Sequence, residues 1–191
     1  MLILGINGSP RKGGNTDILL GYALQGAKMA GASVNRVNLG EYKYSPCLSC
    51  DNQRKDGKCI VKDDMEKVYS LFNDADGIII ASPVYFGSVS AQLKMMIDRF
   101  QCRWSAKYLH KTIKRDKSRT GAFICIEASD KVSFFENSRS VVKNLFVTLD
   151  IDYSAELLCA GLEKKAEVLN KKDLLSKAEK LGADIVNIIR R

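Results

Sequence analysis

The 191-residue sequence lacks the features that direct a chain into a membrane or out of the cell. No apolar run approaches the ~20 residues that span a bilayer, so we expect no membrane segment. The opening stretch, MLILGINGSP, has no basic leader and too short an apolar run for a signal peptide. Six cysteines without an export signal therefore indicate reduced thiols in the cytoplasm rather than a disulfide framework.

Histidine is almost absent as well, which limits the catalytic chemistry that side chains could perform. His110 is the only one, and it lies in the basic run 103–119, where a solvated side chain is the ordinary interpretation. No Ser–His–Asp or Cys–His arrangement can be assembled around it. The net charge of +8 favours anionic partners in general, without choosing among a nucleotide phosphate, an acidic protein and nucleic acid.

The chain length and the order of its patterns predict one α/β domain over residues 1–191. Strand-like apolar runs occupy residues 2–6, 33–39, 77–81, 121–126 and 151–159, and helical patterns lie between and after them. This alternation predicts a parallel sheet with helices on both faces. Ligands of such sheets bind beyond the carboxyl ends of the strands, where the strand order reverses, so the loops after strands one, three and four are candidate sites.

The loop after strand one, GINGSPRKGGNT at residues 5–16, predicts a phosphate site. A buried strand that enters a Gly-rich turn and opens a helix directs backbone N–H groups and the positive helix end at one point. Neither the dinucleotide fingerprint G-x-G-x-x-G nor the P-loop G-x-x-x-x-G-K-[ST] fits this loop. The candidate ligands are the side chains or backbone of Ser9, Arg11, Lys12, Gly14, Asn15 and Thr16. The alternative is a glycine-rich turn with an ordinary helix cap.

The loop after strand three, SPVYFGS at residues 82–88, carries no charge. Proline, aromatic side chains and glycine suit a flat conjugated ring, which needs apolar contact on its faces and backbone groups at its edge. The alternative is a strand end with ordinary core aromatics. The loop after strand four, Glu127–Asp130, contains no glycine.

Together, GSPRKGGNT and SPVYFGSVSAQLKMMIDRF resemble the flavodoxin-like NAD(P)H-dependent FMN reductases, and most closely their iron–sulfur flavoprotein branch. The resemblance covers residues 1–103 and returns weakly near 157–182. It implies a three-layer sandwich with a five-stranded parallel sheet in the order 2-1-3-4-5, and homodimers or homotetramers. It also implies bound FMN, with the phosphate at the candidate ligands of residues 9–16 and the isoalloxazine along Pro83, Val84, Tyr85, Phe86 and Gly87. The family often has a Gly-rich loop after strand four, so we expect that edge of the ring to be built differently here.

The resemblance implies an FMN-dependent oxidoreductase that passes electrons from NAD(P)H to a quinone, ferredoxin or another acceptor. The chemistry belongs to the flavin, and no catalytic side chain is expected. An alternative is a flavoprotein electron carrier that receives electrons from a protein such as ferredoxin. A third interpretation is a regulatory or nucleic-acid-binding module that has the flavodoxin-like fold but no longer binds flavin. We do not expect a nucleic-acid partner.

The segment PCLSCDNQRKDGKC at residues 46–59, within an expected loop insertion at 41–63, raises the question of a metal. The iron–sulfur branch resembles C-x2-C-x2-C-x5-C here; Cys47, Cys50 and Cys59 match it, whereas Gln53 stands at the third position. Glutamine is a poor ligand for iron in a sulfide environment. Four interpretations stay open: a cluster on three thiolates, a fourth ligand from Cys102 or another subunit, no metal, or zinc.

Overall fold

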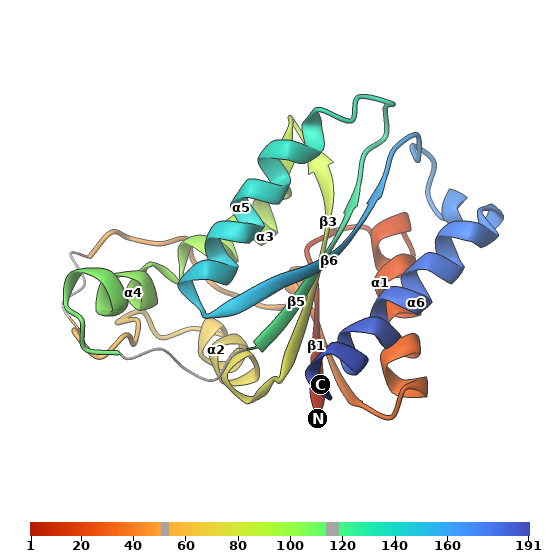
Figure 1. Ribbon diagram of the computed structural model, residues 1–191. Helices are drawn as coiled ribbons and strands as arrows, with labels where there is room; N and C mark the ends of the chain where they lie inside the picture. The colour runs from red at the N-terminus through yellow and green to blue at the C-terminus, as the bar shows by residue number, and fades with distance from the viewer. Residues whose placement is uncertain (51–53, 114–118) are drawn as a thin grey trace.

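The computed structural model describes residues 1–50, 54–113 and 119–191 (Figure 1). One sheet runs through its centre, and its long strands are β1 (Leu2–Asn7), β2 (Ser33–Asn38), β3 (Gly77–Tyr85), β5 (Arg119–Ile126) and β6 (Ile151–Cys159). They are parallel and lie in the order β2-β1-β3-β5-β6. The five predicted strands thus have the predicted order. The sheet differs from the prediction in a sixth strand, β4 (Ser88–Val89), which pairs antiparallel with the end of β3.

Helices cover both faces of the sheet, as Figure 1 shows. The helices α1 (Asn15–Met29) and α6 (Lys172–Ile189) pack on one face, and α2 (Met65–Asp74), α3 (Ala91–Asp98) and α5 (Phe134–Thr148) pack on the other. Shorter helical pieces are α4 (Gln101–Trp104), the π-helical turn η2 (Ser105–Leu109), and the 3-10 turns η1 (Leu39–Glu41) and η3 (Glu167–Asn170). Among the described residues, none of these helices has the length and apolarity that crossing a bilayer requires.

Helices α1 and α6 pack unusually closely because each of them presents a glycine to the backbone of the other. A Cβ atom at Gly26 would lie 1.9 Å from the carbonyl oxygen of Glu179, and one at Gly182 would lie 1.7 Å from that of Ala23. Any side chain at either glycine would therefore push the helices apart. This contact fixes the C-terminal helix beside the helix that opens the candidate phosphate loop.

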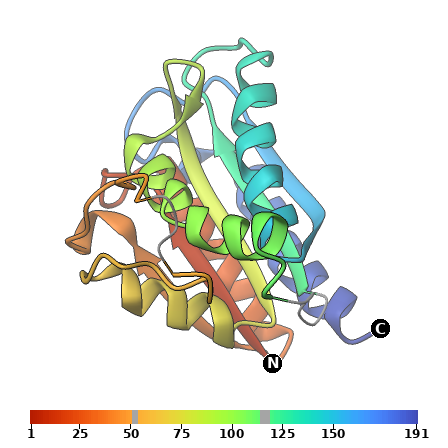
Figure 2. The same cartoon turned by 90° about the vertical axis from the view of Figure 1, so that its left-hand side faces the viewer.

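The cysteine-containing segment and the region around α4 lie side by side, although they are some fifty residues apart in sequence (Figure 2). The hydroxyl of Thr112 donates to the carbonyl oxygen of Lys55. A Cβ at Gly57, whose φ is +76°, would lie 2.8 Å from Ile113. The same Cβ position is 3.3 Å from the Arg103 side chain, so the segment packs beside α4. No local sequence pattern predicts contacts between residues so far apart in the chain.

Candidate functional site

A hollow of about 260 Å³ opens at the carboxyl ends of β1, β3 and β5. This is the edge of the sheet at which the strand order reverses, between β1 and β3, and α/β folds bind their ligands there. Eight of the predicted cofactor residues line it: Ser9, Arg11, Gly14, Asn15, Thr16, Pro83, Val84 and Tyr85. The structure therefore brings the two candidate loops into one site.

The two loops are tied together by hydrogen bonds that involve Gly8 and Ser90. The amide of Gly8 donates to the carbonyl oxygen of Ala81 at 2.8 Å, and the hydroxyl of Ser90 donates to the carbonyl oxygen of Gly8 at 2.6 Å. The amide of Ser90 in turn donates to the hydroxyl of Ser82 at 3.0 Å. A Cβ at Gly8 would lie 2.9 Å from the Cβ of Leu93, so the close approach of the loops requires a residue without a side chain.

Hydrogen bonds within the protein fix the shape of the phosphate loop. The Asp17 carboxylate accepts the amide of Gly13 at 2.7 Å, and the Ser9 hydroxyl accepts the amide of Arg11 at 3.2 Å. No side chain caps the N-terminus of α1 at Gly14. The first N–H groups of a helix have no intrahelical acceptor, and they carry the positive end of the helix dipole. An anion in the hollow would satisfy them.

The side chain of Asn15 forms its hydrogen bonds with the segment that follows β6. Its Nδ2 donates to the carbonyl oxygens of Leu162, at 3.2 Å, and of Lys164, at 2.9 Å. Its Oδ1 accepts the amide of Val168 at 3.1 Å. Because both amide hydrogens are committed to the loop after β6, Asn15 offers an anion its backbone N–H rather than its side chain.

Lys12 lies outside the lining of the hollow, and its ammonium bonds to the Glu41 carboxylate at 2.8 Å. This hydrogen bond holds the pKa of Glu41 below its ordinary value. Glu41 belongs to η1, which follows β2, so the partner of Lys12 comes from a distant part of the chain. The nearby Arg11 differs, because it is exposed and lines the hollow.

The uncharged loop forms a tight hairpin between β3 and β4, in which Tyr85 pairs with Ser88. Phe86 and Gly87 form the two-residue turn with φ of +50° and +73°, and both lie outside the lining of the hollow. A bulky residue in the left-handed region is strained. The Phe86 side chain is nevertheless fully exposed, at 109% of its reference area. Asn137 of α5 donates to the carbonyl oxygen of Gly87 at 2.9 Å and holds this tip in place.

Four residues that line the hollow are not among the site residues predicted from the sequence: Ile126, Ala128, Leu162 and Glu163. The first two belong to the end of β5 and the loop after it, the expected but unassigned edge of the ring. In that loop the Glu127 carboxylate accepts the amide and the hydroxyl of Ser129, both at 3.0 Å, so the turn closes without glycine. The other two follow β6, where the sequence offers no glycine-rich or aromatic signal.

The structure does not assemble the cysteines into a metal centre. Cys47, Cys50 and Cys59 are half-buried free thiols, and Gln53 lies outside the described residues. In the ranges that the structure describes, no group of three or more His, Cys, Asp or Glu side chains is placed to hold a metal ion. The Sγ of Cys59 instead accepts a hydrogen bond from Arg99 Nη2 at 3.5 Å. The described residues therefore do not fit a four-thiolate cluster.

Arg99 binds residues on both sides of the cysteine segment in the sequence. Its side chain is only 1% exposed, and it pairs with the Asp63 carboxylate at 2.7 Å and donates to the carbonyl oxygen of Ser45 at 2.8 Å. Burial raises the pKa of Asp63, but hydrogen bonds from Arg99, Ser45 and Met65 outweigh it and leave this pKa below its ordinary value. The buried Arg99 thus joins Ser45 and Asp63, which stand before and after the three thiols in the sequence.

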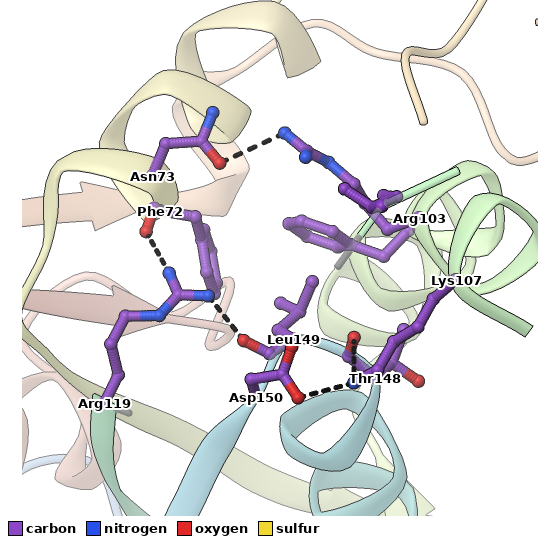
Figure 3. A pocket seen from close by; sticks show the side chains of 10 residues that line it. Phe72, Asn73, Arg103, Lys107, Arg119, Thr148, Leu149 and Asp150 are labelled. Atoms are coloured by element: carbon purple, nitrogen blue, oxygen red, sulfur yellow. Dashed lines mark hydrogen bonds and ion pairs between the residues drawn. The ribbon is translucent and has the colours of Figure 1, made fainter. Parts of the chain in front are cut away.

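A second hollow of about 220 Å³ lies at the amino ends of the strands, opposite the first (Figure 3). Its basic side chains are engaged by protein acceptors. Arg119 donates to the carbonyl oxygens of Phe72 and Leu149, and Lys107 donates to that of Val147 and to the Asp150 carboxylate. Cations at helix C-termini stabilise the last carbonyl groups, which explains these residues structurally.

The doubly wound sheet, with its two loops meeting at the switch point, defines a flavodoxin-like protein. More particularly, the chain belongs to the NADPH-dependent FMN reductase family, whose model matches residues 1–128. FMN-dependent oxidoreduction is the chemistry of that family, and the predicted family is confirmed.

Individual relatives agree with this assignment. An iron–sulfur flavoprotein of Methanocaldococcus jannaschii is 43% identical over 99 residues, 52% of this chain and 51% of that protein. A second one from the same organism is 43% identical over 128 residues, 66% of this chain and 61% of its own length. They confirm the predicted branch, although the chain spans only about half to three fifths of their lengths. A solved flavone reductase has the same fold, with a TM-score of 0.77 at 21% identity, over 100% of this chain and 63% of that one.

Proposed function

We propose that this chain binds FMN in the hollow at the carboxyl edge and passes electrons from NAD(P)H to an acceptor such as a quinone or ferredoxin. The observation that carries the proposal is the meeting of the phosphate loop with residues Pro83–Tyr85 in one cavity. The family supports FMN as the flavin. We propose further that residues 1–191 form one domain, with 41–63 as an insertion, and that the chain works in the cytoplasm as a homodimer or homotetramer.

The phosphate end of the hollow is built to hold a dianion. Asn15 and the buried Thr16, in the first turn of α1, line it, and the exposed Arg11 adds a charge. Charge-assisted hydrogen bonds contribute about 1.5–3 kcal/mol each, so a few of them hold a phosphate. The lining residues fit FMN at this end because their donors have no competing acceptor within the helix.

Apolar residues line the part of the hollow formed by the ends of β3 and β5. They are Pro83, Val84, Ile126 and Ala128, and Pro83 lies beside Ile126 as its register partner in the sheet. These groups would orient a flat ring and exclude water from its edge. When bound, FMN supplies the redox chemistry, because its ring accepts a hydride and releases electrons.

The described lining contains no histidine, and its one carboxylate is that of Glu163. His110 lies at the end of η2, outside the hollow. The side chains are therefore suited to binding and alignment rather than to proton transfer, and alignment is what hydride transfer requires. That no catalytic side chain takes part stays a prediction.

A second candidate function is that of an electron carrier served by an acidic protein such as ferredoxin. It is favoured by the packing of the cysteine segment beside α4, where one hollow is lined by four basic side chains: Arg54, Lys58, Lys62 and Arg103. Such a surface would steer an acidic partner. Electron transfer from reduced ferredoxin, without any reduction by NAD(P)H, would favour this candidate.

The proposed site is tested by blocking the hollow. We expect Ala128→Trp, which places an indole in the lining, to weaken FMN binding at least tenfold in a fluorescence titration. Val132→Trp is the control, because Val132 is exposed on the same loop but lies outside the lining. Equal FMN affinities of the two variants would contradict the proposed site.

A further inference from the structure

We infer that Lys165, from the loop after β6, supplies a cation to the phosphate of FMN. This inference rests on the proposed function and deepens it. The family model ends at residue 128, so it does not assign any part of this loop. The sequence GLEKKAEVLN around Lys165 has the composition of an ordinary solvated surface.

The loop reaches the hollow through its own backbone. Leu162 and Glu163 line the cavity together with Gly14 and Asn15 at the start of α1. The amide of Leu162 donates to the carbonyl oxygen of Glu127 at 3.2 Å, which fixes the beginning of the loop to the end of β5. The loop is therefore part of the site's wall rather than a distant surface segment.

Asn15 then fixes the direction of the loop on both sides of Lys165. Its side chain holds the carbonyl oxygen of Lys164 before it and the amide of Val168 after it. Between them Ala166 adopts a left-handed conformation with φ of +61°, and the buried Val168 anchors the end of the turn. These contacts determine where the Lys165 side chain leaves the backbone.

The Lys165 side chain extends over the phosphate loop. Its Cε lies 3.7 Å from the position that a Cβ at Gly13 would occupy. The ammonium is one bond beyond Cε and moves on a flexible stem. Gly13 has φ of +66° and no side chain, so nothing at that position separates the ammonium from the N-terminus of α1.

The charge balance of the site gives this cation a role. Lys12 is engaged by Glu41, and the Glu163 carboxylate lines the hollow and opposes an anion. The helix dipole contributes only about half an elementary charge, whereas FMN carries nearly two negative charges on its phosphate. Lys165 is exposed and forms no ion pair within the part of the chain that the structure describes. Its ammonium therefore remains available to complement Arg11.

The test compares FMN with riboflavin, which has the same ring and no phosphate, in fluorescence titrations of the full chain. We expect Lys165→Met to weaken FMN about tenfold and riboflavin less than twofold. Lys164→Met, a change of the same kind one position earlier, should alter neither affinity. Lys165→Arg should restore most of the FMN affinity, and Lys165→Met should lessen its dependence on salt concentration.

Two results would overturn the inference while the proposed function stands. One is an FMN affinity of Lys165→Met equal to that of the parent protein. The other is an equal loss for FMN and riboflavin, which would indicate a general change of the loop. A parent protein that binds neither flavin would instead overturn the proposed function and this inference together, so the two failures are distinguishable.

Discussion

The hydroxyl of Ser90 donates a 2.6 Å hydrogen bond to the carbonyl oxygen of Gly8, and this bond joins the loop after β1 to the start of α3. The Ser90 Oγ also accepts the amide of Leu93 at 3.2 Å and so caps α3. One buried side chain thereby fixes the distance between the two loops that line the hollow.

We expect Ser90→Ala to lower the free energy of unfolding by about 2 kcal/mol, since it leaves a buried carbonyl unsatisfied and removes a helix cap. Urea denaturation measures this. Ser105→Ala is the control, because Ser105 is equally buried and its hydroxyl has no hydrogen-bond partner among the described residues. Similar losses in the two variants would contradict the role given to the Ser90 bond.

Substitutions at the neighbouring residues Asn15 and Thr16 should have different effects: the first should lower mainly stability, and the second mainly flavin affinity. Asn15→Ala should lose about 2–3 kcal/mol of stability, because three backbone groups of the β6–α6 loop, two of them in buried hydrogen bonds, lose their partner. Thr16→Val keeps its shape and should lose under about 1 kcal/mol, yet weaken FMN about tenfold. Urea denaturation and FMN titration of both variants decide this. A Thr16→Val protein with parental FMN affinity would remove Thr16 from the phosphate site.

The Arg99–Asp63 pair should make stability depend on pH in the acidic range. The pKa of Asp63 is below its ordinary value in the folded protein, so its contribution is present above pH ~4 and is lost as the pH falls through the folded pKa. Asp63→Asn should remove this dependence and lower stability by about 3 kcal/mol, because Arg99 remains buried.

The control for this prediction is Asp98→Asn, which breaks an exposed pair with Lys94 and should change stability by less than about 0.5 kcal/mol. Urea denaturation between about pH 3 and pH 7 gives both quantities for each protein. If stability falls as steeply with acid in Asp63→Asn as in the parent protein, other carboxylates cause the pH dependence.

The hairpin tip should tolerate a better turn residue. Asparagine is favoured where both turn residues have positive φ, so Phe86→Asn should stabilise the fold by about 1 kcal/mol and raise the melting temperature by a few degrees. The exposed Phe86 ring buries nothing that would be lost. A lower melting temperature would show that the ring makes a stabilising contact, as would occur in an oligomer.

The sequence predicts the strands and the two loops because local chemistry specifies them. The run GIIIA is apolar enough to be buried on both faces, and the glycines near residue 13 permit the turn before α1. Asn15 is different, because its hydrogen bonds go to residues about 150 positions away. No local pattern predicts these bonds, so a polar side chain beside a phosphate loop is naturally interpreted as a phosphate ligand.

The same limit applies to the pairing of Lys12 with Glu41 and to the lining residues after β6. The short strand β4 has only two residues, which is too few for a period-2 pattern to predict. The spacing of the cysteines leaves a cluster, zinc and no metal open, because whether three thiols converge depends on how Arg99 and α4 hold the segment. Residue types can be read locally, whereas the partner of a polar side chain depends on the tertiary fold.

The visible spectrum of the purified protein, reconstituted with FMN and titrated anaerobically with NADPH, tests the proposed function. We expect oxidised flavin bands at a stoichiometry near one FMN per chain, which bleach on addition of NADPH and return when a quinone is added. A chain that binds no flavin after reconstitution would contradict the proposed function. Bound flavin that NADPH does not bleach, but reduced ferredoxin does, would replace the reductase by the electron carrier.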